Sequence, residues 1–360
     1  MVIRAETPKQ LLAAIQSGAE IELVGGREYL VDPRNAYQTA IRLDGIEGLE
    51  IRTDRTAEHP ATIKLAPGDY AKSEPVVLFG MGRTARASRM RFERIALDGN
   101  DSQIVGESKQ QSALVRAFCC NDLAFDRVAF NNIAADGIKI AGHPDRGRAF
   151  GISLRDCTSD NTGRAAVVVQ SLTEDIEIIG FTALVQRKAA IDIEATMDGH
   201  RGPRGVRLIE CDLTAVDGLQ IGGNERVEAY LDSVSVHGPV LVHNGRVTMI
   251  SVFAESLLVR KRSQANVISS RFDSVELTHH QSQCPSALLR SSSLGALRAK
   301  SHSGLELVDC GCESVTIDNE ARDVDLPSVR IRNTRNRDGQ PTPVKIERRP
   351  WSSIGDTIRE

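Results

Sequence analysis

The chain has 360 residues, of which 41% are hydrophobic and 26% charged, a composition typical of folded rather than disordered proteins. Its net charge of −3 lacks the basic excess of nucleic-acid-binding domains, and no apolar run reaches the roughly 18 residues of a membrane span. We therefore expect neither nucleic acid nor a membrane as a partner.

The first predicted element is a short helix that closes one end of the fold. Thr7 is suited to the N-cap, Pro8 to the first helical position and Gln10 to a capping box, and LLAAIQSG follows. The opening residues contain no apolar stretch of a secretory signal. Location is left open between the cytoplasm and a virion or extracellular site reached by another route.

A repeated pair of strands then runs through most of the chain. The longer member alternates apolar and polar residues, and its copies begin 19 to 33 residues apart, at Met90, Leu123, Ile152, Ile176, Val206, Glu228, Val247, Asn266, Ser286 and Leu305. Period-two alternation with Asn, Asp and Gly between the copies is typical of strands joined by turns.

A shorter strand follows most of these copies. Examples are GIKI from Gly137, AVVV from Ala166, AIDI from Ala190 and GLQI from Gly218. Without helices between the strands, the repeat predicts an all-β, right-handed, single-stranded parallel β-helix (a β-solenoid) with an N-terminal capping helix. We divide the chain into 1–30 (cap helix and first strand), 31–325 (β-helix) and 326–360 (C-terminal cap or tail).

The coils are longest between residues 90 and 227, where the extra residues form loops such as 141–150 and 195–205. Insertions in a solenoid go into loops that often line the binding face. The functional surface is therefore expected in this region. The seven cysteines show no metal-type spacing, so no metal site is predicted from them.

Outward side chains of the short strands form the candidate site, because faces alternate along a strand. Asp192 and Glu194 share one face, with Cα atoms about 6.7 Å apart, which suits either carboxylate arrangement of glycoside hydrolysis. Asp198 on the next loop is a third catalytic candidate. We also expect residues on or beside these short strands and on the long loops to bind substrate. Those on or beside the strands are Lys139, Arg164, Lys188, Gln170 and Gln220, and those on the loops are His143 and His200.

A lyase remains an alternative to a hydrolase. Proton abstraction beside a uronate carboxylate needs a base and a group that neutralises the substrate acid, roles open to Lys139, Arg164 and Lys188. In that alternative Asp136 or Asp217 would bind Ca²⁺; otherwise no cofactor is expected.

Three segments resemble pectin-lyase-like right-handed β-helix proteins. TPKQLLAAIQSGAEIELVGGREYLV (Thr7–Val31) is similar to their opening, and SDNTGRAAVVVQS (Ser159–Ser171) with AAIDIEATMDG (Ala189–Gly199) is similar to paired strands in bacterial and phage members. The resemblance implies polysaccharide lyases, glycoside hydrolases or tailspike depolymerases. The polygalacturonase Gly-His-Gly signature and the longer Arg-Pro-containing motif of pectate lyases are absent, and aromatic residues make up only 4%.

We therefore predict a carbohydrate-active protein that cleaves a polysaccharide, with Asp192 and Glu194 as the acid/base or nucleophile pair. The alternative is a non-catalytic phage, virion or surface spike that binds a glycan receptor as a homotrimer, or a purely structural β-helix.

Overall fold

The computed structural model describes residues 2–33, 38–67, 76–100, 112–133, 135–186, 188–196, 200–278, 285–300, 303–319 and 328–348. Its single described helix is α1 (Pro8–Ala14). The first strands are β1 (Val2–Ala5), β2 (Glu20–Leu23), β3 (Glu28–Val31), β4 (Thr39–Arg42), β5 (Glu50–Thr53), β6 (Ala61–Leu65), β7 (Val77–Met81), β8 (Ser88–Glu93) and β9 (Ile95–Asp98).

The middle of the chain contributes twelve strands. They are β10 (Ala113–Phe118), β11 (Asn121–Asp126), β12 (Ala129–Ile133), β13 (Asp136–Ala141), β14 (Ala149–Arg155), β15 (Thr158–Thr162), β16 (Ala165–Val169), β17 (Thr173–Ile179), β18 (Thr182–Gln186), β19 (Ala189–Ala195), β20 (Arg204–Ile209) and β21 (Asp212–Ala215).

The remaining strands complete the stack. They are β22 (Leu219–Asp232), β23 (Ser235–Ile250), β24 (Phe253–Arg260), β25 (Gln264–Ile268), β26 (Arg271–Thr278), β27 (Ser286–Arg290), β28 (Ser293–Lys300), β29 (Gly304–Val308), β30 (Gly311–Asn319), β31 (Ser328–Arg332) and β32 (Val344–Arg348). β31 and β32, which lie beyond residue 325, pair with β29 and β30.

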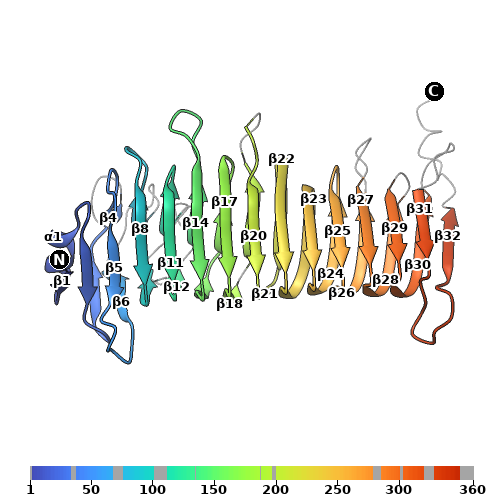
Figure 1. Ribbon diagram of the computed structural model, residues 1–360, viewed down its shortest axis with the longest axis horizontal. Coiled ribbons are helices and arrows are strands. Elements are labelled where there is room, and N and C mark those ends of the chain that lie inside the picture. The colour runs from blue at the N-terminus through green and yellow to red at the C-terminus, as the bar shows by residue number, and fades with distance from the viewer. Residues whose placement is uncertain are drawn as a thin grey trace, which may run out of the picture.

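The strands wind into one elongated solenoid in which the named strand pairs are all parallel (Figure 1). In the middle of the chain each strand pairs with the third one along, as in β10–β13–β16–β19, so one coil contains three strands. The predicted parallel β-helix is confirmed.

Three faces surround the core. The first face contains β10, β13, β16, β19, residues 219–222 of β22 and residues 239–243 of β23. The second contains β8, β11, β14, β17, β20, the later parts of β22 and β23, and then β25, β27, β29 and β31. The third contains β9, β12, β15, β18, β21 and the start of β23.

The expected two-strand unit therefore needs one correction. Each of the longer predicted strands is divided in two by a bend, and the halves lie on the second and third faces. The bend residue has a left-handed backbone in successive coils, for example Arg127 (φ 53°), Asp156 (φ 50°) and Glu210 (φ 53°). The residue after the bend points inward, so the alternation resumes there after one additional outward residue. The sequence therefore reads as one strand.

The capping helix forms as expected. The Thr7 side chain accepts a hydrogen bond from the Gln10 backbone amide at 3.2 Å, and Gln10 Oε1 accepts one from the Glu6 amide at 2.8 Å. The first bond satisfies an amide that the first helical turn leaves free, and the second ties the residue before the N-cap to the helix. Leu11 and Ala14 are buried, so α1 covers the first coil.

The core consists of stacked inward side chains. Ile138, Val167, Ile191 and Leu219 occupy equivalent positions and none is exposed. Phenylalanine rings add a second stack, with Phe92 and Phe125 centroids 5.0 Å apart. The described cysteines are free and buried, among them Cys157 and Cys211 just after the bend; Cys284 lies outside the described residues.

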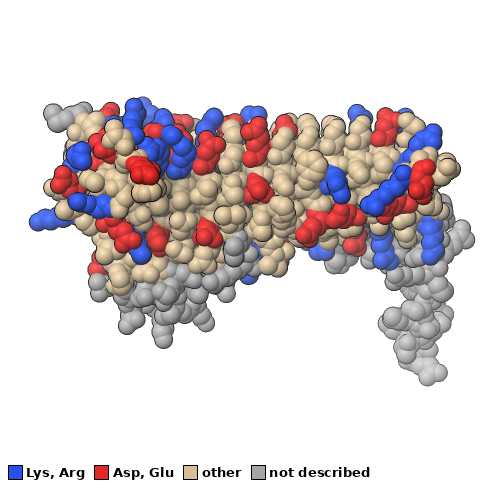
Figure 2. Space-filling model, turned by 90° about the horizontal axis from the view of Figure 1, so that it is seen from below, with Lys and Arg blue, Asp and Glu red and all other residues tan. Residues whose placement is uncertain are grey.

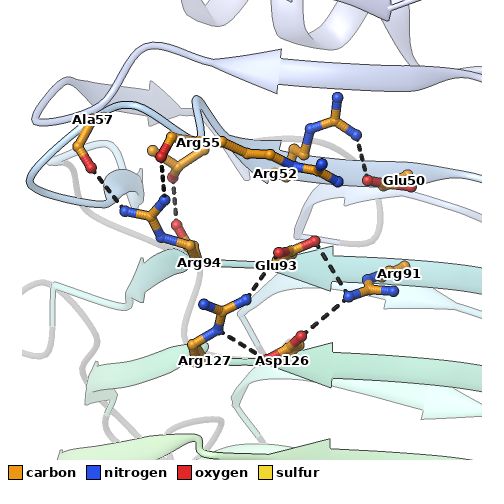
Figure 3. Close-up of polar contacts among 10 residues, drawn as sticks. Glu50, Arg52, Arg55, Ala57, Arg91, Glu93, Arg94, Asp126 and Arg127 are labelled. Carbon is orange, nitrogen blue, oxygen red and sulfur yellow. Dashed lines mark hydrogen bonds and ion pairs between the residues drawn. The ribbon is translucent and has the colours of Figure 1, made fainter.

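A network of ion pairs covers the N-terminal part of the second face (Figure 3). Glu93, only 8% exposed, pairs with Arg91 (3.3 Å) and with Arg127 (2.9 Å), and Arg91 also pairs with Asp126 (3.1 Å). Arg94 donates to the carbonyl oxygens of Arg55 and Ala57. The network ties successive coils together, and Lys and Arg gather at this end of the molecule in Figure 2.

No helix among the described residues is long and apolar enough to cross a membrane.

Candidate functional site

The candidate site lies on the outer side of the first face. β13, β16, β19 and β22 place Lys139, Val168, Asp192 and Gln220 in one register row along the solenoid axis. Neighbouring strands lie about 4.8 Å apart, so these side chains form a continuous row.

Asp192 and Glu194 point to the same outer side of β19. Both are half-buried. Ile191, which precedes Asp192, and Ile193, which lies between the two carboxylates, are completely buried in the core. The alternation follows from the amphipathic sequence AIDIEA, because exchanging the two sides would expose two isoleucines. The two carboxylates also line one shallow pocket of about 240 Å³, together with Gln220, Ile221, Gly222, Gly223, Leu241 and His243.

The environment of Asp192 favours its neutral form. Burial is the main cause that raises the pKa of Asp192 to about 7, and the negative charge of Glu194 raises it further. The positive charges of Arg164 and Lys139 act in the opposite direction. Asp192 is thus protonated in a substantial fraction of molecules near neutral pH, which a proton donor requires.

Glu194 has a different environment. Gln170, at the end of β16, donates a hydrogen bond from Nε2 to Glu194 Oε1 at 2.5 Å. This contact fixes the orientation of the Glu194 carboxylate. Two carboxylates with different surroundings can take different roles in acid–base chemistry.

A buried ion pair supports one side of the site. Arg164 donates to both carboxylate oxygens of Asp136, at 2.8 and 2.7 Å, and Asp136 is 0% exposed. Burial raises the pKa of Asp136 while Arg164 opposes that shift. Arg164 is therefore a partner of Asp136 in this structure, and Asp136 presents no exposed oxygen to a Ca²⁺ ion.

Lys139 lies beside this pair and is only 8% exposed. Burial lowers its pKa, Asp136 opposes that change, and the charges of Arg164 and Arg116 add to it. Lys139 is thus a buried amine with a reduced affinity for its proton, near the carboxylates but on β13, which is separated from β19 by β16.

The other predicted residues do not line the carboxylate pocket. Lys188 is exposed just before β19, and His143 and His200 lie on the loops after β13 and before β20. His143 Nδ1 accepts a hydrogen bond from the Asp145 backbone amide at 3.2 Å. Asp198 lies outside the described residues. Among those described, no group of three His, Cys, Asp or Glu side chains is arranged to bind a metal.

Sequence reasoning missed His243. It follows the short strand PVLV and, through Gly222, lies in register with Glu194, two strands away. A Cβ at Gly222 (φ 147°) would lie 1.7 Å from the His243 carbonyl oxygen, so this position requires glycine. Glu194, Gly222 and His243 all line the carboxylate pocket. Extending the outward row one strand further would have found His243.

Two larger hollows lie outside the region where long loops were expected to mark function. One, of about 640 Å³, lies on the second face between β23 and β31. The other, of about 840 Å³, lies near β26, β28 and β30. Both lie in the half of the chain with the shortest coils.

Comparison with known proteins shows the fold. No family model and no curated sequence matches the chain. Among solved structures, it is similar to the A-module of the Azotobacter vinelandii mannuronan C-5 epimerase AlgE6, with a TM-score of 0.52 and 11% identity, over 92% of this chain and 99% of that one.

It is also similar to a double mutant of the tailspike protein of E. coli bacteriophage HK620, with a TM-score of 0.50 and 11% identity, over 92% of this chain and 77% of that one. Both are parallel β-helix proteins, so the resemblance to the pectin-lyase-like group is confirmed for the fold.

Proposed function

We propose that this protein hydrolyses glycosidic bonds of a polysaccharide, with Asp192 as the proton donor and Glu194 as the base or nucleophile. The observation that carries the proposal is the pairing of two half-buried carboxylates on one pocket, with the pKa of Asp192 raised to about 7. The shared fold with a mannuronan C-5 epimerase module supports a polysaccharide as the substrate class.

The proposed reaction divides the work between these two residues. Asp192 donates its proton to the glycosidic oxygen as the bond from that oxygen to the anomeric carbon breaks. Glu194 either takes a proton from the water that attacks the anomeric carbon or attacks that carbon itself, forming an intermediate that water then hydrolyses. Gln170 keeps the Glu194 carboxylate oriented during either course.

The test measures release of reducing ends from a panel of acidic and neutral polysaccharides. We expect Asp192→Asn and Glu194→Gln each to lower the rate by about 10²–10⁴-fold, the usual contribution of a general acid or base. Glu276→Gln is the matched control, because Glu276 is a half-buried outward carboxylate of β26 in the same register row. Unchanged cleavage by both site variants would remove the proposal.

A second candidate is a polyuronate lyase, and Lys139 is the observation that favours it. A buried amine with a lowered pKa is suited to abstract a proton beside a carboxylate. Elimination yields an unsaturated uronate that absorbs ultraviolet light, whereas hydrolysis yields none. Product absorbance that depends on Lys139 and not on Asp192 would favour this candidate.

Binding without cleavage is the remaining alternative, with the protein as a homotrimeric glycan-binding spike. Polar side chains of the first face would then hold a glycan receptor. Light scattering that gives a trimer mass, together with glycan binding and no new reducing ends, would favour it.

A further inference from the structure

We propose that the hollow of about 640 Å³ on the second face is a second, non-catalytic binding site for the same polysaccharide. This site, here called the trough, is lined mainly by outward residues of β23, β25, β27 and β29. The choice of a polysaccharide as its ligand rests on the proposed function.

The trough is elongated along the solenoid axis. Arg246, Gln264, Ser286 and Gly304 are consecutive partners in register on four adjacent strands. At a strand spacing of about 4.8 Å, this row is about 14 Å long. A linear chain molecule fits such a shape better than a compact ligand does.

Small residues create the hollow. Ser286 and Gly304 occupy outward positions of the same register row in which the two preceding strands have the longer side chains of Gln264 and Arg246. Gly304 does not have a left-handed backbone, and a Cβ there would meet only Ser286, whose Cβ would lie 3.3 Å away. The backbone therefore does not require glycine at this position, and its effect is to keep the trough open.

The lining is suited to hydroxyl-rich ligands. Thr248, Asn266 and Gln264 supply hydroxyl and amide groups, and Asn266 Oδ1 is a buried atom with no hydrogen-bond partner within the described part of the chain. At one end Arg246 Nε and Arg226 Nη2 both donate to Gln264 Oε1, at 3.2 and 3.0 Å. This neutral acceptor holds both guanidinium groups in place and leaves other N–H donors for a ligand.

The trough begins close to the carboxylate pocket. His243 lines that pocket and Arg246 lines the trough, and both belong to β23, separated by Asn244 and Gly245 at the corner between two faces. Three residues of strand span about 10 Å. One polysaccharide chain can therefore occupy the carboxylate pocket, pass this corner and continue along the second face.

The experiment uses the full chain carrying Asp192→Asn and Glu194→Gln, so that cleavage does not consume the ligand. Affinity is measured for polymannuronate, polygalacturonate, hyaluronan and dextran, each as long polymer and as short fragments. We expect at least one polymer to bind more tightly than its fragments. Gly304→Leu, which fills the trough, and Arg246→Ala should each weaken polymer binding by about tenfold.

Fragment binding should change less than polymer binding, and Arg207→Ala, which removes an exposed arginine from the same face, should change neither. Thermal melts check that the variants fold. The proposal would be overturned if Gly304→Leu bound the polymer as tightly as the parent chain does, or if the parent chain bound none of the polymers. Light scattering in which Gly304→Leu dissociates an oligomer would also overturn it, because the trough would then hold a second copy of the chain.

These outcomes are separate from the test of hydrolysis. If Asp192→Asn and Glu194→Gln leave cleavage intact, the catalytic assignment fails while the trough variants still report on binding. If the trough variants bind polymer normally, the trough proposal fails while the catalytic assignment stands.

Discussion

Gln170 donates a hydrogen bond to Glu194 across two neighbouring strands, although 24 residues separate them in the chain. Asp192, two residues before Glu194, has no such donor among the side chains that the structure describes. The two carboxylates of one pocket are thus held differently, one oriented by an amide and the other kept partly neutral by burial.

This relationship predicts a positioning role for Gln170. Gln170→Ala frees the Glu194 carboxylate to rotate, so we expect kcat to fall by about tenfold with little change in KM. Gln220→Ala is a suitable comparison, because Gln220 lines the same pocket from the strand on the other side of β19. A change confined to KM would show that Gln170 binds substrate instead.

The rate should depend on pH through Asp192. With a pKa of about 7, Asp192 is protonated below that pH and loses its proton above it. A proton donor works only in the protonated form, so kcat is expected to fall as pH rises through about 7. A pH–rate profile measured from weakly acidic to weakly alkaline pH shows this limb, and a profile that is flat across neutrality would contradict the assignment.

The same group makes stability depend on pH. The pKa of Asp192 in the folded chain lies above its ordinary value of 3.8, so the folded state binds the proton more tightly. The contribution of Asp192 to the free energy of unfolding is therefore fully present at about pH 4 and is lost as pH rises towards 7. At about 1.4 kcal/mol per pKa unit, the loss amounts to a few kcal/mol.

Asp192→Asn removes this dependence. The variant should melt at a higher temperature than the unmodified protein at about pH 8 and close to it at about pH 4. Melting curves at the two pH values measure the difference, and Glu276→Gln serves as the control. If Asp192→Asn instead melted at a higher temperature than the unmodified protein at about pH 4 and not at about pH 8, the predicted direction of the pH dependence would be wrong.

The Asp136–Arg164 pair should be important for stability. Arg164→Ala leaves a carboxylate with 0% exposure without its partner, and we expect a loss of about 3–5 kcal/mol in the free energy of unfolding. Removing both charges, with Asp136→Asn and Arg164→Met, should cost less than Arg164→Ala alone. Denaturant unfolding of the single and double variants measures the coupling, and additive losses would mean that the pair does not act as a unit.

His243 is predicted to contribute to the carboxylate pocket. His243→Asn should lower kcat/KM by about tenfold or more, because His243 lines the same pocket as Asp192 and Glu194 and an imidazole can transfer protons there. His237→Asn provides the control, since His237 is an exposed histidine of the same strand that pairs with Asp212 at 3.2 Å. Equal effects of the two variants would remove His243 from the site.

The sequence by itself determined the solenoid and the side of β19 on which its carboxylates lie. Alternation in AIDIEA leaves one arrangement that buries Ile191 and Ile193, and burying them stabilises the fold far more than the reverse arrangement would. The capping helix could be predicted for a similar reason, because Thr7 and Gln10 act within one turn.

Only the tertiary structure decided which distant residues meet. Stacking of coils whose lengths vary brings Gln170 to Glu194, Arg164 to Asp136 and His243 to the same pocket. It also opens the trough, since Ser286 and Gly304 form a hollow only when their strands lie side by side. The alternation of each short strand predicts which side chains share an outward row, and the structure has Lys139, Asp192 and Gln220 in one such row. The contacts that these side chains make also depend on loop geometry, which the alternation does not specify.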